Sequence, residues 1–322
     1  MPSLDVAAGI IGLGRIGHQF GRSASGEALS HSEAYGELAE VRVALGVDPD
    51  PEARADFARR FPDAEVFASL EEVPEGRRLD VLSVCSPTHL HAAGVEAGLR
   101  MQARVILCEK PLASDVAVAE RMVAACAKAG CILIPNYSRR WTPMLRQLEE
   151  LVRPGGRLGT PLGASLRYNG GLMHNGTHWI DFLQALFGPV AKAWRIEGPE
   201  GEEDPAESIS LQWASGFTAQ LIAVRGTQCS IGEGELWGDA GLARYQDGGN
   251  RVSFQVARPS QWPGFREFGP PELLTETGLR GHILDAVSEA VRLVRHGGRP
   301  ACTAEDGIQT LRVVAMVRAL QL

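Results

Sequence analysis

Short apolar runs alternate with helix-forming stretches over the first 136 residues. Five of these runs are rich in Val, Ile and Leu, and they lie at residues 6–11, 41–47, 81–85, 105–108 and 132–135. Continuous apolar runs of this length are typical of strands that are buried on both faces of a parallel sheet. The alternation therefore predicts a doubly wound α/β (Rossmann) domain over residues 1–136, with a ligand crevice at the carboxyl ends of its strands.

Capping residues mark the helices between these runs. Asp50 before Pro51 predicts a helix that reaches about residue 60, because Asp is a good N-cap and Pro fits the first helical position. Asp115 predicts a helix that ends at Gly130, and Thr88 predicts another that continues through residue 99. Each predicted helix follows a predicted strand, as a doubly wound sheet requires.

The pattern changes after residue 136, where shorter runs with strand character are separated by turn residues. Strands are predicted at 162–168, 208–213, 218–225 and 251–256, and helices at 143–152, 178–187, 280–295 and 305–320. Thr142 caps the first of these helices, and Thr303 with Asp306 caps the last. The mixture predicts a second domain over residues 137–322, of the α+β class and built on a largely antiparallel sheet. An open face of that sheet favours a homo-oligomer.

The composition is acidic. The chain of 322 residues carries 32 Lys plus Arg against 39 Asp plus Glu, a formal net charge of -7. This balance argues against a nucleic-acid partner and against binding to an anionic membrane surface, and no apolar run reaches the length of a membrane span. Six scattered cysteines without a C-x-x-C pair indicate reduced core thiols in a cytoplasmic protein.

A glycine motif follows the first predicted strand. Gly12, Gly14 and Gly17, with Arg15 and Ile16 between the last two, form G-x-G-x-x-G at the entrance to a predicted helix. The first glycine permits a tight turn, the second lets the backbone approach a pyrophosphate, and the third lets the helix pack on the strand. In this context the motif predicts a dinucleotide-binding turn rather than a purely structural one.

Asp48 ends the second predicted strand. A carboxylate there accepts hydrogen bonds from the adenosine ribose and repels a 2'-phosphate, so it favours NAD. The alternative is that Asp48 only caps the turn before Pro49. NADP is less favoured because no basic residue occupies positions 49–52, but Arg15 and Arg54 are near enough in sequence to leave it open.

The spacing from Gly14 to Asp48 is 34 positions, longer than the usual ~20. The surplus lies in segment 23–40, which is interpreted as a polar insertion carrying His31 and Tyr35.

The third predicted strand leads into Ser86, Pro87 and Thr88, with His91 three residues further on. A rigid proline before a helix N-terminus can form a wall beside the ribose and nicotinamide of a cofactor, so these four residues are predicted to contact it. Histidines in a helix are more often surface or core residues than catalysts, and no catalytic role is assigned to His91.

Glu109 and Lys110 follow the next strand, again at the carboxyl edge of the sheet. A lysine there can donate a hydrogen bond to a reacting hydroxyl or carbonyl oxygen and stabilise a developing alkoxide. Glu109 is counted with the cofactor-contacting residues. The alternative for Lys110 is an ordinary surface lysine.

Together these motifs resemble the Gfo/Idh/MocA family of glucose/fructose oxidoreductases and inositol dehydrogenases. Segments 12–17, 86–91, 109–112 and 136–141 carry the resemblance, and segment 170–181 is similar to the family's glycine-rich G-x-H-x-x-D motif. The resemblance implies a dinucleotide domain followed by a substrate domain whose sheet often makes a dimer or tetramer contact. It also implies that Lys110 and His178 are the motif lysine and histidine. His174 stands where many members carry Asp, so a simple Asp/His relay is in doubt.

These residues suggest an explicit reaction. A secondary alcohol of a sugar or cyclitol passes hydride to nicotinamide C4, His178 takes the hydroxyl proton, and Lys110 holds the oxygen. An imidazole, with an ordinary pKa near ~6.5, suits this exchange. Asp181 shares a helix face with His178 and could orient it, and His174 could assist.

Four further residues are predicted to bind substrate: Arg139, Arg140, Trp141 and Asn175. The two arginines suit an anionic part of a substrate or of the cofactor, but they could instead pair with acidic residues.

Three alternative functions or sites compete with this interpretation. The spacing of His174, His178 and Asp181 is found in helical metal sites, but Gly176 is expected to interrupt the helix, so no metal is predicted. A redox-neutral glycoside hydrolase would use NAD without net reduction. A non-catalytic dinucleotide sensor would have no need of the Lys110 and His178 pair.

Overall fold

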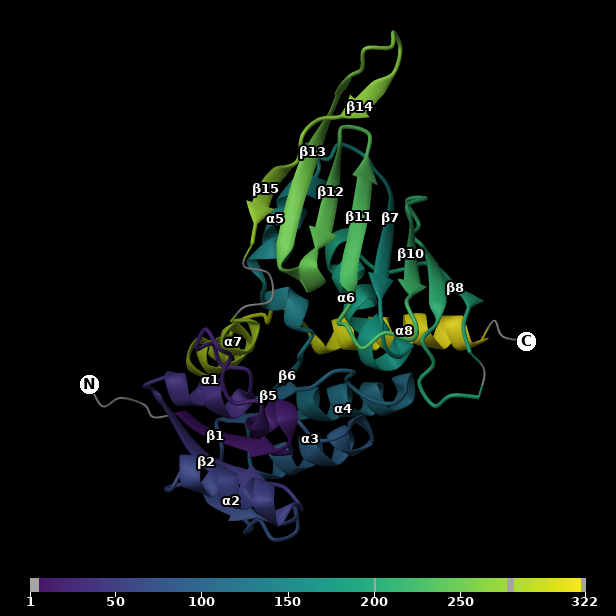
Figure 1. Cartoon of the computed structure of the whole chain (residues 1–322). Coiled ribbons are helices and arrows are strands. Elements are labelled where there is room, and N and C mark those ends of the chain that lie inside the picture. Colours follow the sequence, from purple (N-terminus) through teal and green to yellow (C-terminus); the bar gives the residue numbers. More distant parts are fainter. Residues whose placement is uncertain (1–5, 200, 277–280, 320–322) are drawn as a thin grey trace. The chain divides into compact units, whose positions relative to one another are not determined.

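The computed structural model describes residues 6–199, 201–276 and 281–319 (Figure 1). The chain divides into two compact units, of which one comprises Met1–Ser138 with Gly281–Ile308 and the other Arg139–Arg280 with Gln309–Leu322. Among the described residues, no helix is both long enough and apolar enough to cross a bilayer.

The first unit is built on a six-stranded parallel sheet with the order β3-β2-β1-β4-β5-β6. Its strands are β1 Val6–Ile11, β2 Val41–Val47, β3 Glu65–Phe67, β4 Val81–Val84, β5 Val105–Cys108 and β6 Ile132–Pro135. All five predicted strands are present, and the short edge strand β3 was not predicted. The crossing from β1 to β4 beside β2 is the change of strand order at which doubly wound sheets bind ligands.

The helices of this unit are α1 His31–Glu37, α2 Pro51–Arg60, α3 His91–Arg100, α4 Val116–Ala129 and α7 His282–His296, with short turns η1 Arg15–Gln19 and η2 Thr88–Leu90. Asp50 and Asp115 cap α2 and α4 as predicted, and Gly130 ends α4 in the left-handed conformation. The Thr88 prediction is wrong, because residues 88–90 form a separate 3-10 turn and α3 begins at His91 without a side-chain cap.

The segment around α1 also differs from the prediction. The glycine motif opens only the five-residue π-helix η1, and a true α-helix begins later, at His31. That helix lies inside the supposed polar insertion, yet His31 and Tyr35 are fully buried. Polar side chains can be buried when they are hydrogen-bonded, and partners from distant strands meet that condition here.

Segment 281–308 was assigned by sequence to the second domain, but it belongs to the first unit. The reason is the apolar face of α7, where Ile283, Val287 and Val291 are buried and the helix contacts α1, β4 and β5. The predicted ends of two helices, at residues 280 and 320, lie outside the described residues.

The second unit is built on a nine-stranded sheet in which only the β7–β10 pair is parallel. The strands are β7 Pro161–Tyr168, β8 Lys192–Glu197, β9 Ser208–Gln212, β10 Thr218–Ala223, β11 Gly232–Gly238, β12 Gly241–Gln246, β13 Arg251–Pro259, β14 Arg266–Phe268 and β15 Glu272–Thr275. The largely antiparallel sheet is confirmed, although β8, β11, β12, β14 and β15 were not predicted.

The helices of the second unit are α5 Pro143–Val152, α6 Thr177–Phe187 and most of α8 Ala304–Ala319, with turns η3 Ser138–Trp141, η4 Leu172–Gly176 and η5 Asp247–Gly249. The caps predicted at Thr142 and at Thr303 with Asp306 are present. Leu148 of α5, Phe182 of α6 and Val314 of α8 pack in one core with the sheet.

Candidate functional site

The three glycines of the turn in the first unit have different surroundings, so each is glycine for a different reason. Gly12 has φ +88°, and a Cβ there would lie 2.6 Å from the Cys85 carbonyl carbon and the Ser86 nitrogen. A Cβ on Gly17 would lie 1.9 Å from the Gly12 oxygen, whereas a Cβ on Gly14 would meet nothing within 4 Å. The first and third glycines therefore serve the protein's own packing. The second leaves open space beside the backbone, as a phosphate cradle requires.

Helix η1 is only one turn long, and its backbone is tied back to the second glycine. The amides of His18 and Gln19 both donate to the Gly14 carbonyl, at 2.9 and 3.0 Å. Arg15 is exposed and Ile16 is half-buried. The long helix dipole expected from the motif is therefore absent from the described structure at this turn, and local backbone amides are what remain available for a phosphate.

Asp48 connects the glycine turn to the end of β2. Its Oδ2 accepts from the Leu13 amide at 2.7 Å, and its Oδ1 accepts from the Asp50 amide at 2.8 Å. The turn-capping alternative is thus present in the structure. It does not compete with a ribose contact, because a carboxylate has about four acceptor sites and only two are used in these bonds. Arg54 donates to the backbone oxygens of Asp48 and Pro49.

The Ser86–Pro87 wall is held from behind by His91. The ring of His91 is buried, with Nε2 2.9 Å from the Ser86 oxygen and Nδ1 3.2 Å from the Leu112 oxygen. Burial lowers the pKa of His91, so the ring is neutral near pH 7 and donates to one carbonyl at a time. His91 therefore fixes the loops after β4 and β5. Its predicted contact with a cofactor stays a prediction, as do those of Ser86, Pro87 and Thr88.

Lys110 follows β5, and the preceding residue is a buried carboxylate. Oε1 of Glu109 lies 3.0 Å from His31 Nε2 and accepts from Asn136 Nδ2 at 2.6 Å. Burial alone would raise the pKa of Glu109. The hydrogen bond and charge of His31, then Asn136 and the charge of Lys110, hold it at about 2. Glu109 is therefore ionised at neutral pH.

The glycine-rich segment of the second unit carries the two histidines. His174 is exposed in η4, and His178 is half-buried in the first turn of α6. Asp204 accepts from the amides of Met173 and His174, at 2.7 and 2.9 Å, and so closes the start of this segment. Asn175 donates to the Asn169 oxygen at 2.7 Å, which fixes the same loop.

Asp181 is fully buried and is bound by Arg140. Nε and Nη2 of Arg140 donate to the two carboxylate oxygens of Asp181, at 2.8 and 2.7 Å. Pairing with an acid was the alternative left open for this arginine. The orienting role of Asp181 towards His178 and the substrate role of Arg140 stay predictions.

Arg139 and Trp141 are also buried, with 8% and 4% of their surfaces exposed. The guanidinium carbon of Arg139 lies 4.0 Å from the centre of the Trp179 ring, a cation–π contact inside the second unit. Any contact of either residue with a substrate stays a prediction, as does the one proposed for Asn175.

These geometries can be compared with known proteins. Residues 6–137 match the model of the oxidoreductase family with an NAD-binding Rossmann fold. A D-apiose dehydrogenase of Paraburkholderia graminis is 24% identical, over 88% of this chain and 82% of that protein. A scyllo-inositol 2-dehydrogenase (NADP(+)) of Bacillus subtilis is 22% identical, over 90% of each. Residues 6–137 therefore belong to the Gfo/Idh/MocA oxidoreductase family.

The likeness extends over both units of this family member. The crystal structure of an aldose-aldose oxidoreductase from Caulobacter crescentus superposes with a TM-score of 0.78, covering 98% of this chain and 97% of that one at 21% identity. Because residues 6–137 match an NAD-binding oxidoreductase family, the protein is an NAD(P)-dependent oxidoreductase. Its two motif residues, Lys110 and His178, lie in different units.

The expectation that Gly176 interrupts the helix, which argued against a metal site at His174, His178 and Asp181, is wrong. Gly176 has helical φ and ψ of -60° and -36°, so η4 continues directly into α6 and the glycine does not interrupt the helix. A Cβ at this position would lie 2.6 Å from Leu172 Cδ1, so glycine is there for close packing. Within the described part of the chain, no three His, Cys, Asp or Glu side chains are grouped as metal ligands.

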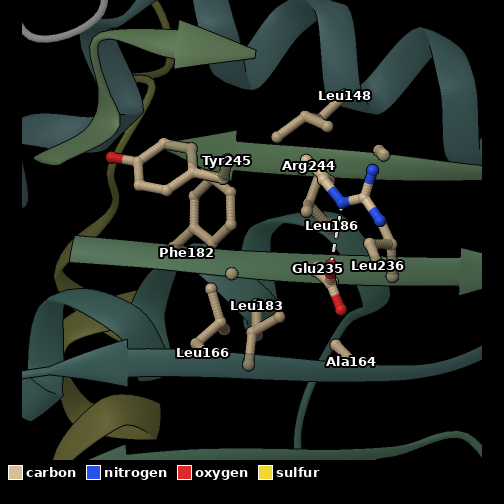
Figure 2. Close-up of a pocket in the computed structure, with 12 residues that line it drawn as sticks. Leu148, Ala164, Leu166, Phe182, Leu183, Leu186, Glu235, Leu236, Arg244 and Tyr245 are labelled. Atoms are coloured by element: carbon tan, nitrogen blue, oxygen red, sulfur yellow. Dashed lines mark hydrogen bonds and ion pairs between the residues drawn. The ribbon is translucent and has the colours of Figure 1, made fainter. Parts of the chain in front are cut away.

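A cavity in the second unit is a packing gap rather than a substrate site. It lies between α5, α6 and the sheet, and Leu148, Leu166, Phe182 and Leu183 contribute to its lining (Figure 2). Its volume of ≈ 20 Å³ has room for about one water molecule, which is too little for a sugar. The Glu235–Arg244 ion pair lies at its edge.

Sequence reasoning assigned no site role to three residues that hold these sites: Asn136, Ser83 and Asp204. Asn136 carried a usable signal, since it directly follows β6 at the same sheet edge as Glu109. Ser83 lies within β4, and Asp204 lies in a loop between β8 and β9, so neither had a local pattern that marked it.

Proposed function

We propose that this oxidoreductase transfers hydride between nicotinamide C4 and a secondary alcohol or ketone of a sugar, a cyclitol or a derivative of one. The observation that carries the proposal is the placement of Lys110. It stands at the carboxyl end of β5, directly after a buried, ionised Glu109, in the unit that holds the glycine turn. The names of the relatives, which include sugar and cyclitol dehydrogenases, support the substrate class.

Each residue has one role in the proposed reaction. When bound at the glycine turn, NAD⁺ would supply the acceptor for the carbinol hydrogen and its electron pair, giving NADH. Lys110 donates a hydrogen bond to the substrate oxygen and stabilises its negative charge. His178 takes the hydroxyl proton as the C=O bond forms, and it returns that proton when a ketone is reduced. Turnover therefore requires the two units to bring these side chains to one carbon.

We propose NAD as the preferred cofactor. Asp48 places a carboxylate at the end of β2, and Arg54 is occupied by backbone oxygens beside it, so no described contact prepares this turn for a 2'-phosphate. The name of one relative that matches over nearly its whole length, the scyllo-inositol 2-dehydrogenase, includes NADP(+). The cofactor preference of this chain therefore needs a direct test. Asp48→Ser should lower the NAD-to-NADP ratio of kcat/KM by about tenfold or more. An unchanged ratio would remove the ribose role.

We also propose a homo-oligomer, a dimer or tetramer, in a reducing compartment such as the cytoplasm. Large apolar side chains are exposed on the sheet of the second unit, among them Leu162, Trp194, Ile196 and Val256. All six cysteines are free thiols, which is consistent with a reducing compartment. Light scattering on the protein and on Ile196→Lys tests the first part. An unaltered monomer in both would contradict it.

The main test is a screen of cyclitols, aldoses, amino sugars and keto-sugars by the absorbance of NADH. With any substrate found, Lys110→Ala and His178→Ala should each lower kcat by at least about a thousandfold, because each group stabilises charge or moves a proton in the transition state. Lys128→Ala, on the exposed surface of α4, is the matched control and should retain full activity.

The alternatives give different results in the same screen. A redox-neutral glycoside hydrolase would release a leaving group without accumulating NADH. A dinucleotide sensor would bind NAD and turn over no polyol. Full activity of Lys110→Ala would contradict the proposed chemistry directly.

A further inference from the structure

Behind Lys110 lies a buried polar cluster that the proposed reaction does not use. It consists of His31 from α1, Ser83 from β4, Glu109 after β5 and Asn136 after β6, with Tyr35 at its inner end. His31, Ser83 and Tyr35 are 0% exposed, and Asn136 is 2% exposed. Buried polar groups are costly unless they are hydrogen-bonded, so a cluster of five at one strand edge needs an explanation.

The hydrogen bonds to Glu109 have a definite direction. Because Glu109 is ionised, it can only accept, and His31 Nε2 must carry the hydrogen that points at it. His31 Nδ1 is hydrogen-bonded to the Ser83 hydroxyl, 2.9 Å away. The Ser83 hydroxyl is in turn 2.9 Å from the Tyr35 hydroxyl. The chain of hydrogen bonds therefore runs from Tyr35 to the Glu109 carboxylate.

This chain is not a route for protons to solvent. Its far end is the hydroxyl of Tyr35, which is fully buried and whose pKa burial raises above its ordinary value. A proton relay needs a solvent-accessible group at its outer end, and the Tyr35 hydroxyl is fully buried. What it provides instead is a fixed, ionised carboxylate at Glu109.

Glu109 acts on its neighbour in two ways. Its Oε2 accepts from the backbone amide of Lys110 at 3.3 Å, which ties the side chain to the residue whose ammonium is to be positioned. The charge of Lys110 is one of the causes that lower the pKa of Glu109. That interaction is mutual, so the carboxylate attracts the ammonium group of Lys110 in return.

We propose that His31, together with Asn136, is a positioning residue for Lys110: it holds the Glu109 carboxylate in place, and the carboxylate in turn keeps the lysine charged and oriented. The proposal rests on the proposed role of Lys110 in turnover. His31 touches no reacting atom in this scheme, and its effect passes entirely through Glu109.

The lysine content of the chain allows the reactivity of the Lys110 amine to be measured against internal references. Only three lysines occur in the sequence, Lys110, Lys128 and Lys192, and the last two are exposed. Competitive acylation with acetic anhydride, read by peptide mass spectrometry, therefore gives the reactivity of Lys110 against two internal references. This measurement needs no substrate. It thus stays informative if the proposed reaction fails.

His31→Leu should raise the relative labelling of Lys110 by about threefold or more, because a Glu109 carboxylate without its His31 donor is no longer held in place towards the ammonium, which then more often presents a free amine. His31→Gln keeps a donor near the position of Nε2 and should restore labelling to within about twofold of the original. Ser32→Ala is the matched control. It removes the neighbouring buried hydrogen bond between Ser32 of α1 and His18, and leaves Glu109 untouched.

Kinetics with a substrate from the screen give the second readout. His31→Leu should lower kcat by about tenfold or more and change the Kd for NAD by less than about threefold. In a Glu109→Gln background, the same substitution should have almost no further effect on kcat, because the carboxylate through which it acts is already gone. If His31→Leu does not fold, His31→Gln and this double variant still test the proposal.

Two outcomes would overturn the inference. One is unchanged labelling and kcat in folded His31→Leu. The other is a loss of kcat that is undiminished in the Glu109→Gln background. Activity of Lys110→Ala would instead overturn the proposed function, and the labelling ratio would still report whether His31 acts on Lys110.

Discussion

Each unit of the molecule buries a carboxylate close in sequence to a predicted catalytic residue, but the two carboxylates are held differently. Glu109, beside Lys110, receives an imidazole, an amide and a backbone N–H from three parts of the chain. Asp181, three residues after His178, receives two parallel hydrogen bonds from the single guanidinium of Arg140. In the first arrangement three parts of the chain contact the carboxylate, and in the second one guanidinium contacts both carboxylate oxygens. We therefore expect Asp181 to be the more sensitive to the loss of one partner.

The largest effect is expected for Arg140→Leu. Removing Arg140 takes away the guanidinium that bonds both oxygens of the buried Asp181 carboxylate and should cost about 3–5 kcal/mol in the free energy of unfolding. The double variant Arg140→Leu/Asp181→Leu should recover most of that loss, since no buried charge remains. Urea denaturation measures both.

Arg153→Leu is the control for Arg140→Leu. It breaks an exposed ion pair with Glu150 and should cost about 1 kcal/mol or less. If Arg140→Leu were as mild as Arg153→Leu, the Arg140–Asp181 ion pair would not hold the second unit together.

The next effect concerns pH and Glu109. Its folded pKa of about 2 lies below the ordinary value of 4.5, so its contribution to stability is fully present above about pH 4.5 and is lost as the pH falls towards 2. The difference corresponds to about 3 kcal/mol at neutral pH. Glu109→Gln should therefore be less stable at pH 7 and should lose less stability between pH 5 and 2.5. Denaturation at a series of pH values tests this, and parallel curves for the two proteins would contradict it.

The sequence indicated the elements whose signals are local. Strands β1, β2, β5 and β6 have the predicted bounds, because each is a continuous apolar run. Asp115 and Gly130 mark the two ends of α4 by their own backbone preferences. The turn at Gly12 was likewise indicated by its immediate neighbours, whereas the roles of Lys110 and His178 came from the family resemblance and stay predictions.

The parts that sequence did not indicate depend on distant contacts. Strand β11 was missed because its glycines resemble turn residues, yet a Cβ on Gly234 would lie 2.5 Å from Leu166 Cδ2 of β7. His31 was taken for part of a polar insertion, since its partner Glu109 is 78 positions away. Asp204 supports a loop 30 positions before it. No local pattern contains such pairings.

Within the glycine turn, Gly12→Ala and Gly14→Ala separate folding from cofactor binding. Gly12→Ala forces a side chain into a left-handed conformation and against the backbone of Cys85 and Ser86, so we expect a loss of about 2–3 kcal/mol in stability. Gly14→Ala meets no atom of the protein and should change stability by less than about 1 kcal/mol. It should nevertheless weaken NAD binding by about tenfold or more, measured by calorimetry. Equal stability of the two variants would contradict the assignment of their roles.

The smallest expected effect is at Asp204, which is the second unit's counterpart to the support behind Lys110. Asp204→Ala removes the acceptor for two amides that begin the segment leading to His178, and should cost about 1–2 kcal/mol in stability. Asp239→Ala is a matched control, because Asp239 accepts from the Thr160 amide at the start of β7. The two variants should lose similar stability, but only Asp204→Ala should lower kcat, by about tenfold, since only its loop carries the histidines. Equal kcat in the two variants would mean that His178 is positioned by α6 alone. The two units would then differ in how they support a catalytic residue, as well as in how they hold a buried charge.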